Sequence, residues 1–259
     1  MQHSVGTDNQ IRNLLLTLCY DGRNYHGWQI QQNACSIQEV FQKALYQIIG
    51  QEVDIKGCSR TDAFVHANMY CISFHTVHTI PCKRLVVALN HYLPMDIAVC
   101  SCKEVPLSFH ARYSATGKEY IYKIWNNKIR SPFLNGYAFH YWYDLDIGKL
   151  QRAADDYIGT HDFTSFCTFD QRKAGNLVRT VKKFTVKRQG SMVLMTVQAD
   201  GFLYHMVRIM VGTLLRVAEG KIKEDGIPAI IEARDRSKAG PTARACGLYL
   251  NKVFYGEVD

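Results

Sequence analysis

The sequence lacks the long apolar runs of a membrane protein. Its longest runs, such as Leu14–Leu18 and Leu85–Leu89, are short and interrupted, whereas a helical membrane span needs about 20 apolar residues. The first ten residues, Met1–Gln10, are polar and contain no apolar stretch typical of a secretory signal. We therefore expect a cytoplasmic protein with no membrane partner.

The sequence also has no Cys-x-x-Cys pair. Its nine cysteines are an odd number in a chain of 259 residues, so neither a disulfide framework nor a zinc ribbon is expected. Cys100 and Cys102 would point to one face of a strand, where we interpret them as small packing residues. His75 and His78 could bind a metal, but no further ligands cluster beside them. We expect no metal site.

Positive charge is present and unevenly distributed. Hydrophobic residues make up 47% of the chain and charged residues 21%, which is typical of a globular protein. Residues 1–169 carry 15 Lys and Arg against 14 Asp and Glu, whereas residues 170–259 carry 16 against 9. A basic region favours a polyanionic partner such as nucleic acid, although a surface adapted for solubility would look the same.

Hydrophobic periodicity predicts more strands than helices. The two kinds of element do not alternate strictly, which indicates the α+β class with mixed, largely antiparallel sheets. We expect strands over residues 14–20, 53–57, 68–74, 97–105, 119–125, 181–188, 192–200 and 248–254, and helices over 36–49, 83–90, 147–158 and 202–219.

A pattern of a helix followed by glycine occurs twice. Residues Ala44–Gly50 and Ala153–Gly159 end alike, and glycine is the residue that most often terminates a helix. The repetition suggests two similar α/β halves, which we place at residues 1–110 and 111–259. The second half is the basic one.

The segment from Gly57 to Ala67 carries the clearest chemical signal. It places Arg60 two residues before Asp62 in a turn, and a neighbouring guanidinium keeps a carboxylate ionised. An ionised carboxylate can act as a nucleophile or a base. Taken alone, however, the motif is better explained as a surface loop with an Arg–Asp ion pair.

Further segments point to an anion-binding site. Residues 201–208 open an apolar helix that contains Arg208, and a buried arginine needs an anionic partner, for which Asp62 is a candidate. Residues 109–120, which end at Tyr120, are polar, basic and aromatic. The polar stretch 171–176 includes Arg172 and Lys173 and is a candidate mobile loop that contacts RNA.

In their order along the chain, these segments resemble the tRNA pseudouridine synthase A family. The matching blocks are Tyr20–Gly22 with Tyr25–Gln29, Arg60–Ala67, Phe109–Tyr120, Gly201–Arg208, Ala239–Ala243 and Gly247–Leu250. The resemblance spans about residues 12–255, and several blocks in the correct order make it specific.

The resemblance implies an enzyme that isomerises uridine to pseudouridine at positions 38–40 of the tRNA anticodon stem-loop. It implies no metal or organic cofactor, and a homodimer whose subunits have two α/β halves flanking a basic cleft. The first half would carry the catalytic Asp62, and the second would complete the site with Tyr120 and Arg208. Arg60 would grip the RNA or occupy the space of the departed base, and Leu248 and Leu250 would line an apolar pocket.

Phe64 is the main departure from the family pattern, which usually has glycine there. If the backbone φ angle is positive at this position, Phe64 is strained. If φ is negative, the ring can form part of the uridine pocket, and that is the alternative we favour. Gly57-Cys58-Ser59 and Arg244 also differ from the usual residues, which bears on substrate range more than on reaction type.

Two rival functions remain open from the sequence. One is an RNA-binding relative that has lost turnover, although it retains all three catalytic candidates. The other is a hydrolase that uses Asp62 on a small substrate, for which a compact neutral pocket is expected. Tritium release from uridine in tRNA separates the first rival from a synthase, and a gel-shift test with tRNA separates the second.

Overall fold

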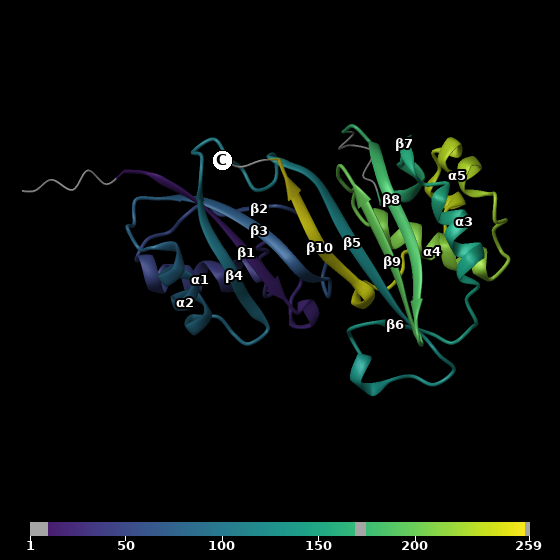
Figure 1. Ribbon diagram of the computed structural model, residues 1–259, viewed down its shortest axis with the longest axis horizontal. Helices are drawn as coiled ribbons and strands as arrows, with labels where there is room; N and C mark the ends of the chain where they lie inside the picture. The colour runs from purple at the N-terminus through teal and green to yellow at the C-terminus, as the bar shows by residue number, and fades with distance from the viewer. Residues whose placement is uncertain (1–9, 169–174, 257–259) are drawn as a thin grey trace, which may run out of the picture. The chain divides into compact units, whose positions relative to one another are not determined.

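A computed structural model describes residues 10–168 and 175–256 and confirms the α+β class (Figure 1). The chain forms two compact units. The first unit comprises residues 1–63, 67–115 and 255–259, and the second comprises 64–66 and 116–254. Residues 64–66 therefore belong to the second unit although the chain on both sides of them belongs to the first.

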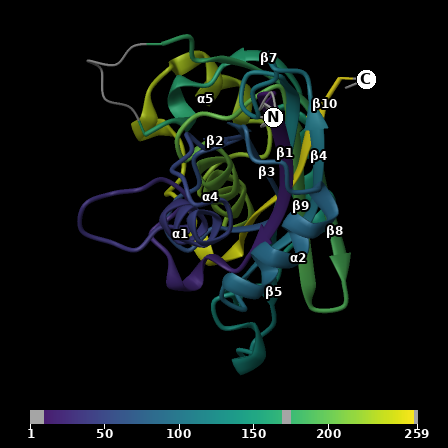
Figure 2. The same ribbon diagram turned by 90° about the vertical axis from the view of Figure 1, so that its left-hand side faces the viewer.

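The first unit is an antiparallel sheet covered by two helices. Its sheet order is β4 (Ile97–Val105), β1 (Arg12–Tyr20) and β3 (His66–Thr76), with β2 (Lys56–Gly57) paired to β3. Helix α2 (Cys82–Tyr92) packs on β4, and α1 (Ile37–Ile49) packs against α2 (Figure 2).

Helix α1 has the start and stop signals that its sequence predicts. The Ser36 side chain accepts a hydrogen bond from the backbone N–H of Glu39, which satisfies one of the free donors at the helix start. Gly50 ends the helix with a left-handed φ of 69°, a conformation that glycine adopts without steric strain. Ile37, Phe41 and Leu45 face the core at helical spacing.

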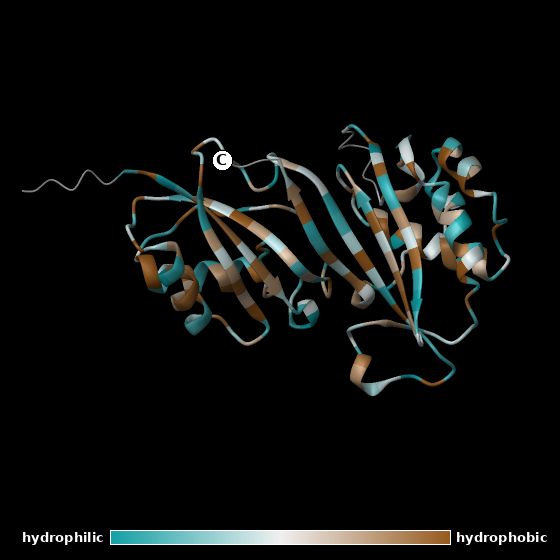
Figure 3. Cartoon of the chain, viewed as in Figure 1, coloured by the Kyte–Doolittle hydropathy of each residue, from teal (hydrophilic) through white to brown (hydrophobic). Residues whose placement is uncertain are grey.

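The second unit contains a larger sheet. Its order is β10 (Leu248–Tyr255), β5 (Ala115–Asn126), β9 (Met192–Ala199), β8 (Val178–Gln189) and β7 (Gly159–Asp162), and β6 (Phe139–Tyr141) runs parallel to β5. Residues along β8 and β9 alternate between hydrophilic and hydrophobic (Figure 3), as in a sheet with one covered face. That face packs on α3 (Ile147–Asp155), which in turn packs on the buried α4 (Met206–Ala218).

Short elements complete the described chain. Helix α5 (Ile227–Ala233) lies against β7. The 3₁₀ turns are η1 (Gly22–Asn24), η2 (Pro132–Leu134), η3 (Thr164–Phe166), η5 (Arg236–Lys238) and η6 (Ala245–Gly247). None of the helices in residues 10–168 and 175–256 has the length and apolar character needed to cross a membrane.

Three expectations about the elements are wrong. Helix α3 ends at Asp155, and Gly159 begins β7 with φ of 122°, so Gly159 does not terminate a helix as Gly50 does. Helix α4 begins at Met206 rather than at residue 202, because His205 adopts a left-handed φ of 63° that helical backbone cannot accommodate. The strand expected over residues 53–57 is only Lys56–Gly57.

Candidate active site

The Asp62 loop, residues 58–63 between β2 and β3, is held by buried aromatic side chains of the first unit. The rings of Trp28 and Tyr70 stack with centroids 4.2 Å apart, and Tyr20 tilts against Tyr70 at 5.6 Å. The Tyr20 hydroxyl is 2.9 Å from the hydroxyl of Thr61 and shares a hydrogen bond with it. The Tyr70 hydroxyl donates to the backbone carbonyl of Ser59. The loop backbone is thus anchored immediately before Asp62.

Gly27 allows the N-terminal segment to approach the loop closely. The N–H of Trp28 donates to the Thr61 carbonyl at 3.3 Å, and Gly27 has a φ of 85°. A Cβ atom at Gly27 would lie 2.2 Å from the Thr61 carbonyl oxygen and 3.1 Å from the carbonyl carbon of Asp62. Only glycine fits here without moving the Thr61–Asp62 peptide.

The contacts that support the Asp62 loop were not predicted from the sequence. Gly57 has the same constraint as Gly27, since a Cβ atom there would lie 2.4 Å from the Tyr70 hydroxyl oxygen and 2.6 Å from Nε1 of Trp28. These contacts join residues from three separate parts of the chain. Tyr20 and Trp28 lie in the N-terminal block of the family resemblance. That block marked them as notable residues, but it gave them no role.

Asp62 is half-buried, whereas Arg60 is exposed. Within residues 10–168 and 175–256, the Arg60 guanidinium has no hydrogen-bond or ion-pair partner. An Arg60–Asp62 ion pair, the explanation that the motif alone favoured, is therefore wrong.

Phe64 has a φ of 65° and is 49% exposed. Our preferred expectation of a negative φ is wrong, and the alternative of a strained residue is correct. A left-handed conformation costs a non-glycine residue about 1–2 kcal/mol because Cβ approaches the following carbonyl oxygen. This conformation gives a physical reason for the glycine that the family pattern has at this position.

Replacing Phe64 should therefore reverse the usual stability order of alanine and glycine. Both variants lose the ring, but only glycine relieves the left-handed strain, so we expect Phe64→Gly to be about 1 kcal/mol more stable than Phe64→Ala. A difference of this size corresponds to about 2–4 °C in Tm for a chain near this size. Thermal unfolding of the two variants measures it. Equal stabilities, or a more stable alanine variant, would show that φ is negative in solution.

His66 anchors the chain just after Phe64 to the second unit. Its Nε2 atom lies 2.9 Å from the carbonyl oxygen of Gly136. Its ring stacks on Tyr249 at 4.5 Å and on Tyr137 at 5.6 Å. His66 is 1% exposed, so it acts as a buried packing residue, a role that the sequence did not assign to it.

Tyr120 lies on β5, opposite Val197 of β9. It is buried, and the ring of Phe202 meets it edge-on with centroids 5.1 Å apart. Leu248 and Leu250 are buried on β10, the strand next to β5 in the second unit's sheet. These three predicted site residues therefore lie on adjacent strands of one sheet.

Arg208 is in the first turn of α4 and is half-buried rather than buried as expected. Its Nε atom donates to the carbonyl of Ala243 at 2.7 Å, and the Ala243 N–H donates to the Arg208 carbonyl at 3.0 Å. The 239–243 segment thus holds both the backbone and the side chain of Arg208.

Two glycines bring that segment against α4. A Cβ atom at Gly212 would lie 1.7 Å from the carbonyl oxygen of Pro241, and one at Gly240 would lie 2.6 Å from the Gly212 oxygen. The Gly240 N–H donates to the Thr213 hydroxyl at 2.8 Å. The Ala239–Ala243 block therefore has a structural function, which is to position Arg208. The other two predicted contacts, Arg172 and Lys173, lie outside the described residues.

Comparison with known proteins decides the family. The family model described as tRNA pseudouridine synthase matches residues 17–114 and 153–256. The chain belongs to the tRNA pseudouridine synthase family. It is an isomerase, an enzyme that converts uridine to pseudouridine. The matched ranges include Asp62 and Arg208 but not residues 115–152, which contain Tyr120.

Relatives of this synthase cover nearly the whole chain. It is 46% identical to tRNA pseudouridine synthase A of Thermoanaerobacter sp. (strain X514), over 95% of this chain and 100% of the relative. The corresponding protein of Acetivibrio thermocellus is 45% identical over the same shares. Among solved structures, a Cbf5-Nop10-Gar1 complex matches with a TM-score of 0.37 and 11% identity, over 93% of this chain and 59% of that chain.

Proposed function

We propose that this synthase isomerises uridines at positions 38–40 in the anticodon stem-loop of tRNA, with Asp62 as the catalytic carboxylate. The observation that carries the proposal is the anchoring of the Asp62 loop by Gly27, Tyr20 and Tyr70. A catalytic carboxylate must be held in a defined position relative to the reacting sugar. The similarity to tRNA pseudouridine synthases A supports the choice of substrate.

The reaction breaks the bond between N1 of uracil and C1′ of the ribose, and it forms a new bond from C5 to C1′. The C5 proton leaves, and N1 gains a proton. A carboxylate at position 62 can attack C1′ and hold the sugar covalently while the base rotates. It can also remove the proton from C2′ to give a glycal. Both routes need an ionised Asp62.

Arg208 and Tyr120 have supporting roles in this proposal. By the family resemblance, Arg208 supplies the guanidinium that a reacting carboxylate such as Asp62 requires. The Ala243 carbonyl contact already restrains that side chain at Nε. Tyr120 stacks on the uracil ring and assists removal of the C5 proton.

The remaining predicted residues act on the RNA or exclude water. The target base must leave the stem, at a cost of a few kcal/mol, and the exposed Arg60 grips the flanking backbone or occupies the vacated space. Leu248 and Leu250 form an apolar wall that keeps water from the detached base. Phe64 contributes an exposed ring beside the Asp62 loop.

Assembly and location follow from the family resemblance. The active form is a homodimer in which one subunit positions the tRNA stem while the other supplies Asp62. The reaction takes place in the cytoplasm, where tRNA is modified, and it uses no metal or organic cofactor, since the carboxylate chemistry is complete without one.

Tritium release tests the reaction itself. With tRNA carrying uridine tritiated at C5, each isomerisation releases one tritium to water, and we expect release by the wild-type protein alone in buffer containing a metal chelator. A protein that binds this tRNA but releases no tritium is the inactive RNA-binding relative, and one that does neither contradicts the proposal altogether.

The affinity for tRNA should depend steeply on salt. Residues 170–259 carry an excess of seven positive charges, and Lys182, Lys183 and Lys187 on β8 are exposed. Each phosphate contact contributes about −0.7 to −0.9 to the slope of log K against log salt concentration. We expect the double change of Arg172 and Lys173 to glutamine to reduce this slope by about 1–2 while Tm stays unchanged.

A matched control uses Lys83 and Arg84, an exposed pair at the start of α2 in the nearly neutral part of the chain. Changing both to glutamine removes the same charge and should leave the slope unaltered. If the affinity of the wild-type protein for tRNA does not change with salt concentration, phosphate contacts do not dominate binding. A lower Tm in the Arg172 and Lys173 variant would make those residues structural.

A further inference from the structure

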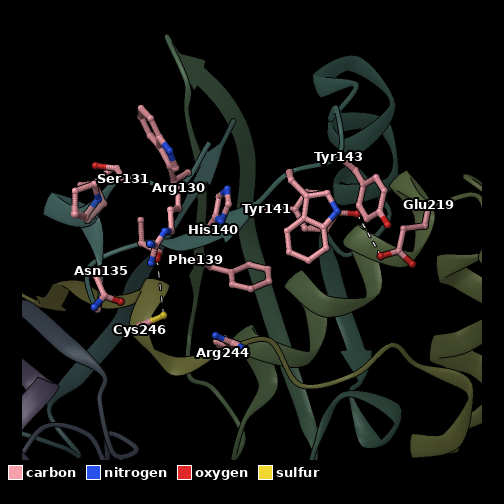
Figure 4. A pocket seen from close by; sticks show the side chains of 16 residues that line it. Arg130, Ser131, Asn135, Phe139, His140, Tyr141, Tyr143, Glu219, Arg244 and Cys246 are labelled. Carbon is pink, nitrogen blue, oxygen red and sulfur yellow. Dashed lines mark hydrogen bonds between the residues drawn. The ribbon is translucent and has the colours of Figure 1, made fainter. Parts of the chain in front are cut away.

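The second unit contains a pocket of about 570 Å³ outside the proposed catalytic residues (Figure 4). Its volume is in the range of small-ligand sites. Most of its lining comes from residues 125–143, within the range 115–152 that the family model does not match. The lining is rich in two kinds of side chain, aromatic rings and guanidinium groups.

The guanidinium groups belong to Arg130 and Arg244, and both side chains are exposed. Figure 4 shows them at the wall of the pocket, on either side of Phe139. In the part of the chain that the structure describes, neither guanidinium has a hydrogen bond or an ion pair. Two arginines that line one pocket, and that have no partner among the described residues, offer positive charge to an anion such as phosphate.

The carboxylate in the pocket does not cancel this charge. Glu219 already forms ion pairs with Arg216 at 2.6 Å and Lys221 at 2.8 Å, and these cations lower the pKa of its carboxyl group. It also accepts a hydrogen bond from the Tyr141 hydroxyl at 3.2 Å. Because Glu219 is fully compensated, Arg130 and Arg244 leave the pocket with excess positive charge.

The aromatic groups supply surfaces for stacking. Trp142 and Tyr143 are 53% and 56% exposed, and Phe139 projects into the pocket (Figure 4). Flat exposed rings next to arginines are the usual means by which proteins hold unpaired bases, since every base has a face that stacks.

Hydrogen bonds fix the shape of this wall before any ligand arrives. Nε1 of Trp125 donates to the Ile129 carbonyl, and Nε2 of His140 lies beside the Asn127 carbonyl, each at 2.9 Å. The loop that carries Arg130 is therefore tied to β5 and β6. A preformed pocket binds with a smaller loss of conformational entropy.

We propose that this pocket binds one unpaired nucleotide of the tRNA, distinct from the uridine that reacts. The base stacks on the exposed rings of Trp142 and Tyr143, and its phosphate binds Arg130 and Arg244. The inference rests on the proposed function, because it takes tRNA to be the ligand. A protein partner is less suitable, since it would have to bring carboxylates for both arginines.

The test measures the affinity of the full chain for tRNA after single changes in the pocket. We expect Arg130→Gln and Arg244→Gln each to weaken binding about tenfold, or ~1.4 kcal/mol, and to reduce the salt slope by about 0.7–0.9 per lost phosphate contact. Trp142→Ala should weaken binding at least fivefold with the salt slope unchanged, because stacking releases no counterions. Lys128→Gln is the matched control. Lys128 is exposed in the same loop, does not line the pocket and forms an ion pair with Asp144 at 3.7 Å. It should change affinity less than twofold.

Ultraviolet crosslinking identifies the ligand directly. We expect Trp142 or Tyr143 to crosslink to one nucleotide of tRNA, and free UMP at millimolar concentration to compete poorly. Unchanged tRNA affinity in both arginine variants overturns the proposal, and so does full competition by free UMP, which would indicate a mononucleotide site. A third result also overturns the proposal: the pocket variants no longer form dimers in light scattering but keep the wild-type salt slope. The pocket would then be a surface between two copies of the chain.

These results are separable from a failure of the proposed reaction. Binding is measured without turnover, so the pocket can be tested even if no uridine is isomerised. Conversely, unaltered binding by the pocket variants leaves the role of Asp62 untouched. Circular dichroism and Tm of each variant establish that a lost affinity does not arise from unfolding.

Discussion

Replacement of Asp62 by asparagine is expected to abolish tritium release, lowering the rate by at least about 10³-fold, since a neutral amide can neither attack C1′ nor accept the C2′ proton. The affinity for tRNA should stay within about tenfold of wild type, a difference of ~1.4 kcal/mol. Folding should be retained, because the Thr61 hydroxyl and the Ser59 carbonyl, which anchor the loop, are unchanged in this variant.

Asp54→Asn is the matched control for this experiment. Asp54 is an exposed carboxylate of the first unit that pairs with Lys56, and its loss removes the same charge a few residues away. We expect its activity to match wild type. Activity near wild type in Asp62→Asn, or an equal loss in both variants, would contradict the assignment of Asp62.

Gly27→Ala is expected to impair catalysis although Gly27 carries no reactive group. The new Cβ atom would lie 2.2 Å from the Thr61 carbonyl oxygen, so the Thr61–Asp62 peptide must shift. A displacement of about 1 Å in a catalytic group can reduce the rate about 10²-fold. The positive φ of 85° adds strain of about 1–2 kcal/mol in the folded state. Tritium release measured well below Tm reports the displacement of the Thr61–Asp62 peptide. Thermal unfolding reports the strain.

Gly50→Ala isolates the strain from the displacement. Gly50 also has a positive φ, of 69°, but no atom lies within 4 Å of the position of its Cβ. This variant should lose about 1 kcal/mol of stability and keep wild-type activity. If Gly27→Ala behaves in the same way, the Asp62 loop does not depend on the close approach of Gly27.

Local signals in the sequence were sufficient for the longer elements. Ser36 and Gly50 marked the ends of α1, and the strand expected over residues 97–105 is the observed β4. Such elements depend on capping and periodicity, which a short window of sequence contains. The same signal is misleading at Gly159, because this glycine starts β7 and does not end a helix. The short elements α5, β6 and β7 carry too few residues for a period to be recognised.

The backbone conformations next to the site could not be predicted from residue type. Phe64 and His205 both have positive φ values, a conformation that side chains other than glycine avoid unless the surrounding structure imposes it. For Phe64, only the family pattern raised the possibility of a positive φ. We favoured a negative φ, which is wrong. At His205, the same effect moved the start of α4 to Met206.

Candidate site residues were easier to name from the sequence than the contacts around them. Asp62 and Arg208 stand in conspicuous motifs, but the Trp28–Tyr70 stack and the Ala243 carbonyl are tertiary contacts. The pocket is a further tertiary feature, since its two arginines, Arg130 and Arg244, are separated by more than 100 positions in the chain. Patterns in sequence suggest candidate reactive groups, and packing decides their positions.

The most direct measurement is a nucleotide-resolved map of pseudouridine in tRNA after incubation with the purified protein, compared with the Asp62→Asn variant. We expect the wild-type protein to convert uridines at positions 38, 39 or 40 of the anticodon stem-loop and the variant to convert none. Pseudouridine only at other positions would refute the substrate assignment, and the same map from both proteins would refute Asp62 as the catalytic residue.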